Sequence, residues 1–258
     1  MSSPLIWGGA VLDAMQAETI TIRGAGGDEI EAYFARPLGA GRRPGVVVIH
    51  HMPGYDRATK EIVRTFAVYG YAAVCPNLFH RYAPGAKSAD AAAAARAAGG
   101  VPDDQCIGDV SGAVEHLRSQ PDSNGKVGVI GYCSGGRQTY LVACTLQVDA
   151  AVDCYGGGVV MSPEQLSTAH PVAPIDLTAK MGCPLLGLFG AEDRNPSPEH
   201  VARMEEELQA HAKTFEFRSY EGAGHAFFSV DRPSYNLEAA KDGWKQIWAF
   251  FGEHLATA

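Results

Sequence analysis

The sequence predicts an α/β fold, a doubly wound and mostly parallel sheet of about eight strands flanked by helices. Short apolar segments rich in β-branched residues alternate along the chain with longer segments of helical periodicity, as in consecutive βαβ units. Some apolar runs, residues 46–49 above all, are continuous, which is typical of strands buried on both faces. With 258 residues, 46% of them hydrophobic, the chain can bury one full core.

Two early segments, residues 19–22 and 30–35, are separated by a glycine-containing turn and predict an antiparallel hairpin at a sheet edge. The other predicted strands cover residues 46–49, 72–75, 126–130, 150–154, 185–189 and 215–220. Helices are predicted over residues 59–69, 88–98, 103–118, 137–146, 197–211 and 237–255, with Asp103 or Asp104 and the pair Ser197-Pro198 as N-terminal caps.

The organisation around these elements is simple. We expect residues 1–17 to form an N-terminal arm and residues 18–258 to form a single domain. The connection over residues 159–183 is long and contains prolines, and connections of that length tend to line a site.

Composition excludes several classes of protein. The formal net charge of −8 and the pI near 5.6 argue against nucleic acid or an anionic membrane as a partner. None of the six cysteines forms a C-x-x-C pair, and thiols spread in this way favour a reducing cytoplasm over a disulfide framework. No apolar run has the length of a membrane span, and residues 4–12 lack the basic leader of a signal peptide.

The candidate chemistry centres on the stretch Gly131-Tyr132-Cys133-Ser134-Gly135-Gly136, between a predicted strand and a predicted helix. Strand, tight turn and helix are the context of a nucleophile elbow, where glycines two residues before and after the nucleophile avoid a clash. Cys133 has both glycines, whereas Ser134 would need one where Tyr132 stands. A thiolate at Cys133 would be stabilised by the helix N-terminus. The alternative is a buried, inert cysteine in a glycine-rich turn.

Two further residues follow predicted strands and are expected at the same edge of the sheet. Asp193 comes after residues 185–189, and His225 comes after residues 215–220. The order nucleophile, acid, histidine is that of α/β-hydrolases. Cys133 would attack a carbonyl carbon, His225 would exchange the proton, and Asp193 would orient the imidazole. Each has an alternative: Glu192 could replace Asp193, which could be a turn residue, and the histidine could be non-catalytic.

Acyl transfer also needs backbone N–H groups that stabilise the oxyanion. One is expected from Ser134, the residue after the nucleophile. The other is expected from the loop after residues 46–49, where Met52 is best placed because Pro53 has no N–H.

With these motifs, residues 18–255 resemble the dienelactone hydrolase (carboxymethylenebutenolidase) family, which has the α/β-hydrolase fold. The resemblance is carried by residues 123–136, with the cysteine elbow, and by Gly222-Ala223-Gly224-His225-Ala226-Phe227, and is supported by residues 70–78 and 190–193. It implies hydrolysis of a small lactone or ester without a cofactor or metal, by a catalytic triad of Cys133, Asp193 and His225. It also implies that Arg81 binds a substrate carboxylate and that Tyr155 lies in the pocket.

The chain departs from the family pattern at two positions. A glutamate that keeps the resting thiol neutral in the type enzyme is here His51, and a second carboxylate-binding arginine is here Ser229. Losing that arginine makes a neutral or singly anchored lactone or ester as plausible a substrate as dienelactone. A nearby imidazolium would favour the thiolate, so we expect His51 to lower the pKa of Cys133. Alternatively, His51 packs against its loop or hydrogen-bonds Glu61 or Asp56; a metal site at His50 and His51 lacks further ligands.

The sequence therefore predicts a carboxylic ester hydrolase that cleaves a small lactone or ester through a thioester, acting as a monomer or homodimer. The alternatives are a broad carboxylesterase that does not act on dienelactones and a non-catalytic relative used for binding. A phosphatase loop would need an arginine where Thr139 stands, and the glycine runs at residues 24–27 and 156–158 lack dinucleotide-binding spacing.

Overall fold

The computed structural model describes residues 14–256, and their framework is an eight-stranded sheet in the order β1-β2-β4-β3-β5-β6-β7-β8. The strands are β1 (Met15–Arg23), β2 (Glu29–Pro37), β3 (Arg43–Ile49), β4 (Ala72–Pro76), β5 (Ser123–Tyr132), β6 (Ala150–Cys154), β7 (Leu185–Gly190) and β8 (Phe215–Tyr220). β1 pairs antiparallel with β2, and β2 pairs antiparallel with β4. Every further neighbouring pair, from β4 to β8, is parallel. The predicted α/β fold with a mostly parallel sheet is confirmed.

The sheet begins earlier than the sequence indicated. Met15 and Ala17 pair with Pro37 and Ala35, so part of the predicted arm belongs to β1. The strand lies at the edge of the sheet, and its first residues, 15–18, are mostly exposed and lack the apolar alternation that predicts a strand over residues 19–22. Of the arm predicted over residues 1–17, residues 1–13 lie outside the described residues.

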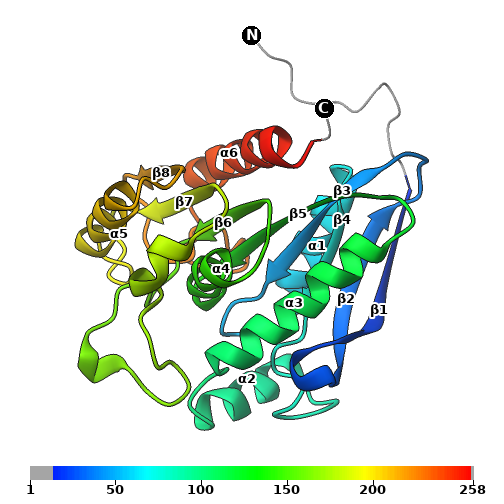
Figure 1. The fold of residues 1–258 in the computed structure, drawn as a ribbon, viewed down its shortest axis with the longest axis horizontal. Helices are drawn as coiled ribbons and strands as arrows, with labels where there is room; N and C mark the ends of the chain where they lie inside the picture. Colours follow the sequence, from blue (N-terminus) through cyan, green and yellow to red (C-terminus); the bar gives the residue numbers. More distant parts are fainter. Residues whose placement is uncertain (1–13, 257–258) are drawn as a thin grey trace.

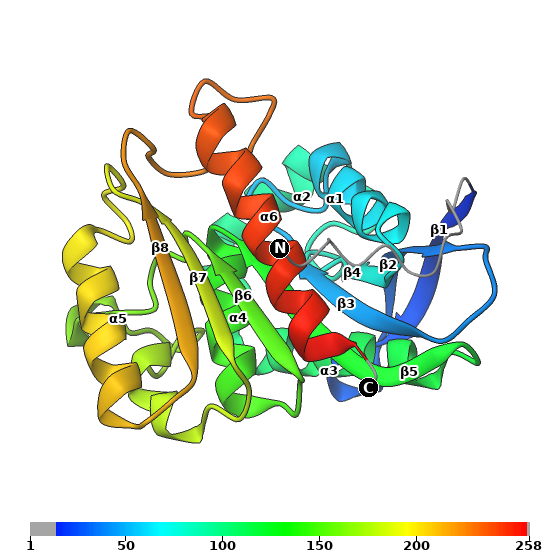
Figure 2. The ribbon, with the colours of Figure 1, turned by 90° about the horizontal axis from the view of Figure 1, so that it is seen from above.

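Helices cover both faces of the sheet (Figures 1 and 2). The α-helices are α1 (Arg57–Val68), α2 (Ser88–Ala97), α3 (Asp103–Ser119), α4 (Ser134–Thr145), α5 (Pro198–Ala210) and α6 (Leu237–Leu255), and the short 3₁₀ helices are η1 (Ala25–Gly27), η2 (Pro163–Gln165) and η3 (Pro174–Lys180). Buried side chains of α1 and α6 form one apolar cluster with the sheet. Those of α2, α3, α4 and α5 form the other, so the sheet is the middle of three layers.

Two helix starts differ from the sequence prediction, and both differences bear on the site. Helix α4 begins at Ser134 rather than near residue 137, so Cys133 alone separates it from β5. Helix α3 is preceded by Pro102 and has no side-chain cap. Asp103, a predicted cap, instead forms a buried ion pair with Arg137 of α4. Local capping signals in the sequence do not reveal this pair. Within residues 14–256, no helix combines the length and apolarity needed to cross a membrane.

Candidate active site

Cys133 occupies a sharp turn that only its flanking glycines permit. Its φ of 57° is in the left-handed region, which costs a non-glycine residue of order 1–3 kcal/mol. A Cβ on Gly131 would lie 2.0 Å from the carbonyl oxygen of Gly135, and one on Gly135 would lie 2.3 Å from that of Ile49. The glycines on either side of the cysteine therefore let β5, β3 and α4 approach closely enough to form the turn.

The sulfur of Cys133 faces three hydrogen-bond donors. They are the imidazole of His225 and the backbone N–H groups of Ser134 and Met52, the two amides expected from the sequence. Burial by itself would raise the pKa of the thiol, but these donors outweigh it and hold the pKa below its ordinary value. The site therefore favours a thiolate at the first turn of α4.

His225 is joined to Asp193 by a hydrogen bond of 2.7 Å between Nδ1 and Oδ2. The other oxygen of Asp193 accepts the N–H of Asn195 at 2.9 Å, and the side chain is buried, whereas Glu192 is exposed. Burial alone would lower the pKa of His225, but the bond to Asp193, helped by Cys133, raises it to about 10. The two shifts act in the same direction and favour an imidazolium beside a thiolate.

The loops that carry the acid and the histidine are brought together by a close contact at Gly190. A Cβ there would lie 2.4 Å from the carbonyl oxygen of Ala223. The N–H of Glu192 also donates to the carbonyl of Ala223. The end of β7 thus packs directly against the turn after β8, which fixes Asp193 beside His225.

His50 is a functional candidate that the sequence analysis considered only as a metal ligand. It is buried, and burial lowers its pKa to about 4, so the ring is neutral. Its Nδ1 lies 2.9 Å from the carbonyl oxygen of His51, and its Nε2 accepts the N–H of Leu78 at 3.2 Å. Nδ1 therefore carries the proton, and the ring anchors the loop that presents the N–H of Met52. In the sequence, the one feature that points to a role for His50 is its position directly after the predicted buried strand of residues 46–49.

His51 does not have the predicted effect of lowering the pKa of Cys133. Its Nε2 lies 2.8 Å from Oδ2 of Asp56, the residue that also caps α1. The groups that lower the pKa of Cys133 do not include His51. The alternative interpretation, a hydrogen bond to Asp56, therefore holds, and His225 replaces His51 as the cause of the lowered pKa.

Tyr155 lies behind the histidine rather than in open space. Its side chain is buried, and its ring meets the rings of His225 and Phe227 edge to face, each at 5.2 Å between centroids. Its hydroxyl has the side chain of Ser229 within hydrogen-bonding reach. The ring of Tyr155 thus packs against the imidazole of His225, and Ser229 lies beside the hydroxyl of Tyr155.

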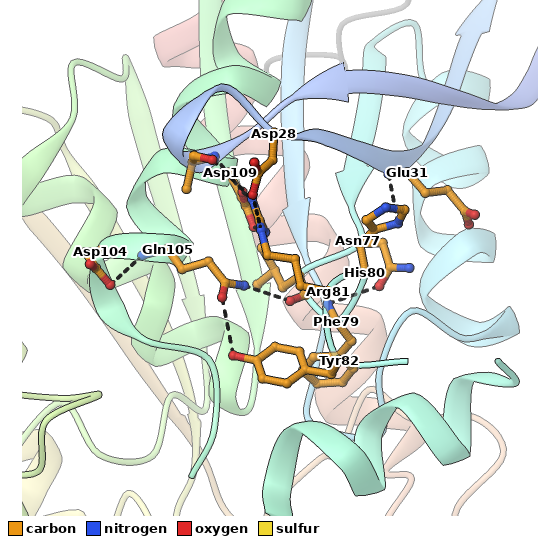
Figure 3. A network of polar contacts seen from close by, with 12 residues as sticks. Asp28, Glu31, Asn77, Phe79, His80, Arg81, Tyr82, Asp104, Gln105 and Asp109 are labelled. Carbon is orange, nitrogen blue, oxygen red and sulfur yellow. Dashed lines mark hydrogen bonds and ion pairs between the residues drawn. The ribbon is translucent and has the colours of Figure 1, made fainter. Parts of the chain in front are cut away.

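The guanidinium of Arg81 is bound by two carboxylates, those of Asp109 and Asp28 (Figure 3). Its guanidinium donates twice to Asp109, at 2.9 and 3.0 Å, and once to Asp28 at 2.8 Å. A fourth bond, at 3.3 Å, reaches the carbonyl oxygen of Ala25. The structure thus gives Arg81 another role: most of its donors are occupied, and it ties the β4–α2 loop to α3 and η1. The expectation that it binds a substrate carboxylate stays a prediction.

A small pocket of about 60 Å³, called here the inner pocket, opens beside the two N–H donors. Its walls include His50, Met52, Phe79, Ser134, Gln138 and His170. His170 comes from the 159–183 connection and contacts Oδ1 of Asp103 at 3.1 Å, and the same carboxylate binds Arg137 at 2.6 and 3.1 Å. The long connection thus contributes to the site, as expected. Among residues 14–256, no group of three His, Cys, Asp or Glu side chains gathers as a metal site would require.

A model of the dienelactone hydrolase family matches residues 30–255. The chain belongs to this family. A protein of Salmonella typhimurium named "Putative carboxymethylenebutenolidase" is 33% identical over 235 residues, covering 88% of this chain and 84% of the relative. A crystal structure titled as a putative dienelactone hydrolase from Klebsiella pneumoniae is 30% identical, with a TM-score of 0.84 over 93% of this chain and 100% of that one. Family membership places the chain among hydrolases of lactones and esters.

A Bradyrhizobium relative named "Probable 2-oxo-3-(5-oxofuran-2-ylidene)propanoate lactonase" is 28% identical over 93% of this chain and 98% of its own length. The structure of a dienelactone hydrolase-like phosphotriesterase from metagenomic libraries is 22% identical with a TM-score of 0.74, a likeness of fold alone.

The position of Arg81 has a consequence for stability. In Arg81→Met, the fully buried carboxylate of Asp109 loses its ion pair, and we expect a loss of about 3 kcal/mol in the free energy of unfolding, measured in urea. The matched control, Arg36→Met, breaks a more exposed contact with Asp122 and should cost less than about 1 kcal/mol. A variant of unchanged stability with a KM raised only for carboxylate-bearing esters would instead restore Arg81 as a substrate ligand.

The thiolate can be followed by the pH dependence of alkylation with iodoacetamide. Only the thiolate reacts, so a lowered pKa moves the midpoint of Cys133 below the ordinary thiol value of about 8.5. We expect His225→Ala to raise the midpoint, because burial of the thiol is then opposed only by the N–H groups of Ser134 and Met52. His51→Ala should leave it unchanged, and a rise there equal to that in His225→Ala would contradict the assignment.

Proposed function

We propose that this protein hydrolyses small lactones and carboxylic esters through Cys133, with His225 and Asp193 completing a catalytic triad. One observation carries the proposal: the imidazole and two backbone N–H groups face a single sulfur, and the far nitrogen of that imidazole is bound to a buried carboxylate. The arrangement provides a nucleophile, a proton carrier with a fixed tautomer and an oxyanion site in one place.

In the first half of the reaction, the thiolate of Cys133 attacks the carbonyl carbon and the carbonyl electrons move to oxygen. The N–H groups of Met52 and Ser134 stabilise that oxyanion, and each donor of this kind contributes about 2.7–4 kcal/mol to the transition state. The C–O bond then breaks, and His225 gives its proton to the departing oxygen. An ester releases its alcohol, whereas the hydroxyl freed from a lactone stays attached to the acyl group.

In the second half, neutral His225 takes a proton from water, and the resulting hydroxide adds to the thioester carbon. The same N–H groups hold the second oxyanion. The C–S bond breaks, the thiolate returns to the imidazolium, and the carboxylic acid product leaves. Asp193 remains ionised throughout, because its role is to keep Nδ1 of His225 as the protonated nitrogen.

The occupied guanidinium of Arg81 favours one alternative within this reaction class. With Arg81 bound to Asp109 and Asp28, and with Ser229 facing Tyr155, neither matching position offers a free arginine to a substrate carboxylate. A broad carboxylesterase acting on neutral esters is therefore the second candidate. The Bradyrhizobium relative is named as the lactonase of an anionic lactone. A lactone of that kind would be a substrate of the first candidate, the lactone hydrolase.

A substrate panel separates the two candidates and tests the class as a whole. Purified protein would be assayed with p-nitrophenyl acetate, longer p-nitrophenyl esters, neutral γ-lactones and a lactone that carries a carboxylate. We expect hydrolysis of the acetate and of small lactones, with rates falling for long acyl chains because the inner pocket is small. Alkylation of Cys133 should abolish all of these rates, and full activity of the alkylated protein would refute the proposal.

A further inference from the structure

A second cavity, called here the outer cavity, is separate from the inner pocket but shares the side chain of Phe79 with it. Its volume is about 450 Å³, within the range of about 300–1,000 Å³ that is usual for small-molecule sites. Cys133, His225 and Asp193 line neither cavity, but the inner pocket includes Met52 and Ser134, whose N–H groups face the sulfur, and the outer cavity does not. Phe79 contributes to both. The reaction proposed above leaves the outer cavity without a role.

Three residues in the wall of this cavity, Asp56, Asn77 and His80, have hydrogen-bond acceptors that are already in use. Asp56 accepts from His51 and from the N–H of Thr59. Oδ1 of Asn77 accepts the N–H of Phe79 at 3.1 Å. Nδ1 of His80 accepts the N–H of Glu31 at 3.4 Å (Figure 3). The carboxylate of Glu31 also lines this wall and adds a negative charge to it.

The donors in the same wall are not matched in this way. Because Nδ1 of His80 accepts, a neutral ring carries its proton on Nε2, and the amide NH₂ of Asn77 remains a free donor. The ammonium of Lys60 forms no ion pair with any residue in the described part of the chain. It lies 4.1 Å from the ring centre of Tyr55 and 5.4 Å from that of Tyr33. Arg57 adds a second cation to the wall.

We propose that the outer cavity binds a small organic anion, a carboxylate or a phosphate ester, through Lys60 and Arg57. Two cations and the buried Tyr55 hydroxyl, which has no hydrogen-bond partner within residues 14–256, suit a ligand rich in acceptors. Asn77 and His80 supply neutral donors, and Phe79 and Tyr55 supply aromatic surface for the carbon part of the ligand. The anion is either the acid group of a substrate that extends past Phe79 or a separate effector.

Calorimetric titration tests the site without any turnover, so its result is independent of the proposed hydrolysis. The probes are inorganic phosphate and succinate at fixed ionic strength, titrated into wild type, Lys60→Met, Arg57→Met and Lys245→Met. Lys245 is exposed on α6, away from the cavity wall, so its substitution removes the same charge as a matched control. We expect saturable binding in wild type and Lys245→Met, and about tenfold or greater weakening in Lys60→Met.

Kinetics then distinguish the two sources of the anion. If the acid group belongs to the substrate, Lys60→Met raises the KM for p-nitrophenyl hemisuccinate about tenfold and leaves that for p-nitrophenyl acetate unchanged. If the anion is an effector, phosphate changes the rate of acetate hydrolysis in wild type and not in Lys60→Met. The proposal is overturned if neither probe binds saturably to wild type, or if Lys60→Met and Lys245→Met bind them equally well.

Discussion

Replacing Cys133 with alanine is expected to lower kcat for ester and lactone hydrolysis on the order of 10⁴-fold or more. The variant keeps the two backbone N–H donors and the bond between His225 and Asp193, so it retains only what substrate binding and the oxyanion site can supply. KM should change much less, because no ground-state contact of comparable strength is removed. Steady-state assays with p-nitrophenyl acetate measure both quantities.

A second cysteine provides the control for this substitution. Cys183 is buried in the other apolar cluster and has no contact with the imidazole. Burial raises its pKa to about 12, so it is an unreactive thiol. Cys183→Ala should retain wild-type kcat. If Cys133→Ala also retained it, the nucleophile would have to be another residue.

Adding one methyl group at Gly131 is expected to disrupt both the fold and the activity. The new Cβ would lie 2.0 Å from the carbonyl oxygen of Gly135 and 2.6 Å from Oγ1 of Thr139. Backbone atoms cannot yield as a flexible side chain can, so β5 and α4 must separate. We expect Gly131→Ala to lose at least about 3 kcal/mol of unfolding free energy and to displace the N–H of Ser134 from the sulfur.

The matched substitution is Gly182→Ala. A Cβ at Gly182 would have no heavy atom within 4 Å, and its φ is not in the left-handed region. Its stability should stay within about 0.5 kcal/mol of wild type, or rise slightly because alanine restricts the unfolded chain. Urea unfolding of the two variants gives the comparison. Equal stability of both variants would mean that the elbow tolerates a side chain at Gly131. The glycine spacing would then give no physical reason to choose Cys133 over Ser134 as the nucleophile.

The elbow could be predicted from sequence because its determinants are local. Gly131 and Gly135 stand at fixed offsets from Cys133, so the motif is visible in a short stretch of sequence even though Gly135 is needed to clear the carbonyl of Ile49 on β3. The buried strands could also be predicted, since a continuous apolar run such as that of β3 reflects burial on both faces. Asp193 could be placed because it follows such a strand, and His225 because it follows the last predicted strand of the parallel sheet.

The contacts of the Arg81 guanidinium could not be predicted in the same way. Its partners lie far along the chain, Asp109 on α3 and Asp28 beside η1, and no local pattern connects them. Asp103 is a similar case, because pairing with Arg137 depends on how α3 packs beside α4. The resemblance to a family assigned Arg81 by its position, whereas the tertiary ion pairs decide whether its guanidinium is available.

The most direct test of the thioester mechanism is the identity of the acylated residue. Wild-type protein mixed with p-nitrophenyl acetate and quenched rapidly in acid would be digested and analysed by mass spectrometry. The mechanism predicts an acetyl group on the sulfur of Cys133 that hydroxylamine removes, and its absence from Cys133→Ala. An acetyl group on the adjacent hydroxyl of Ser134, or on any other residue that turns over at the rate of hydrolysis, would contradict it.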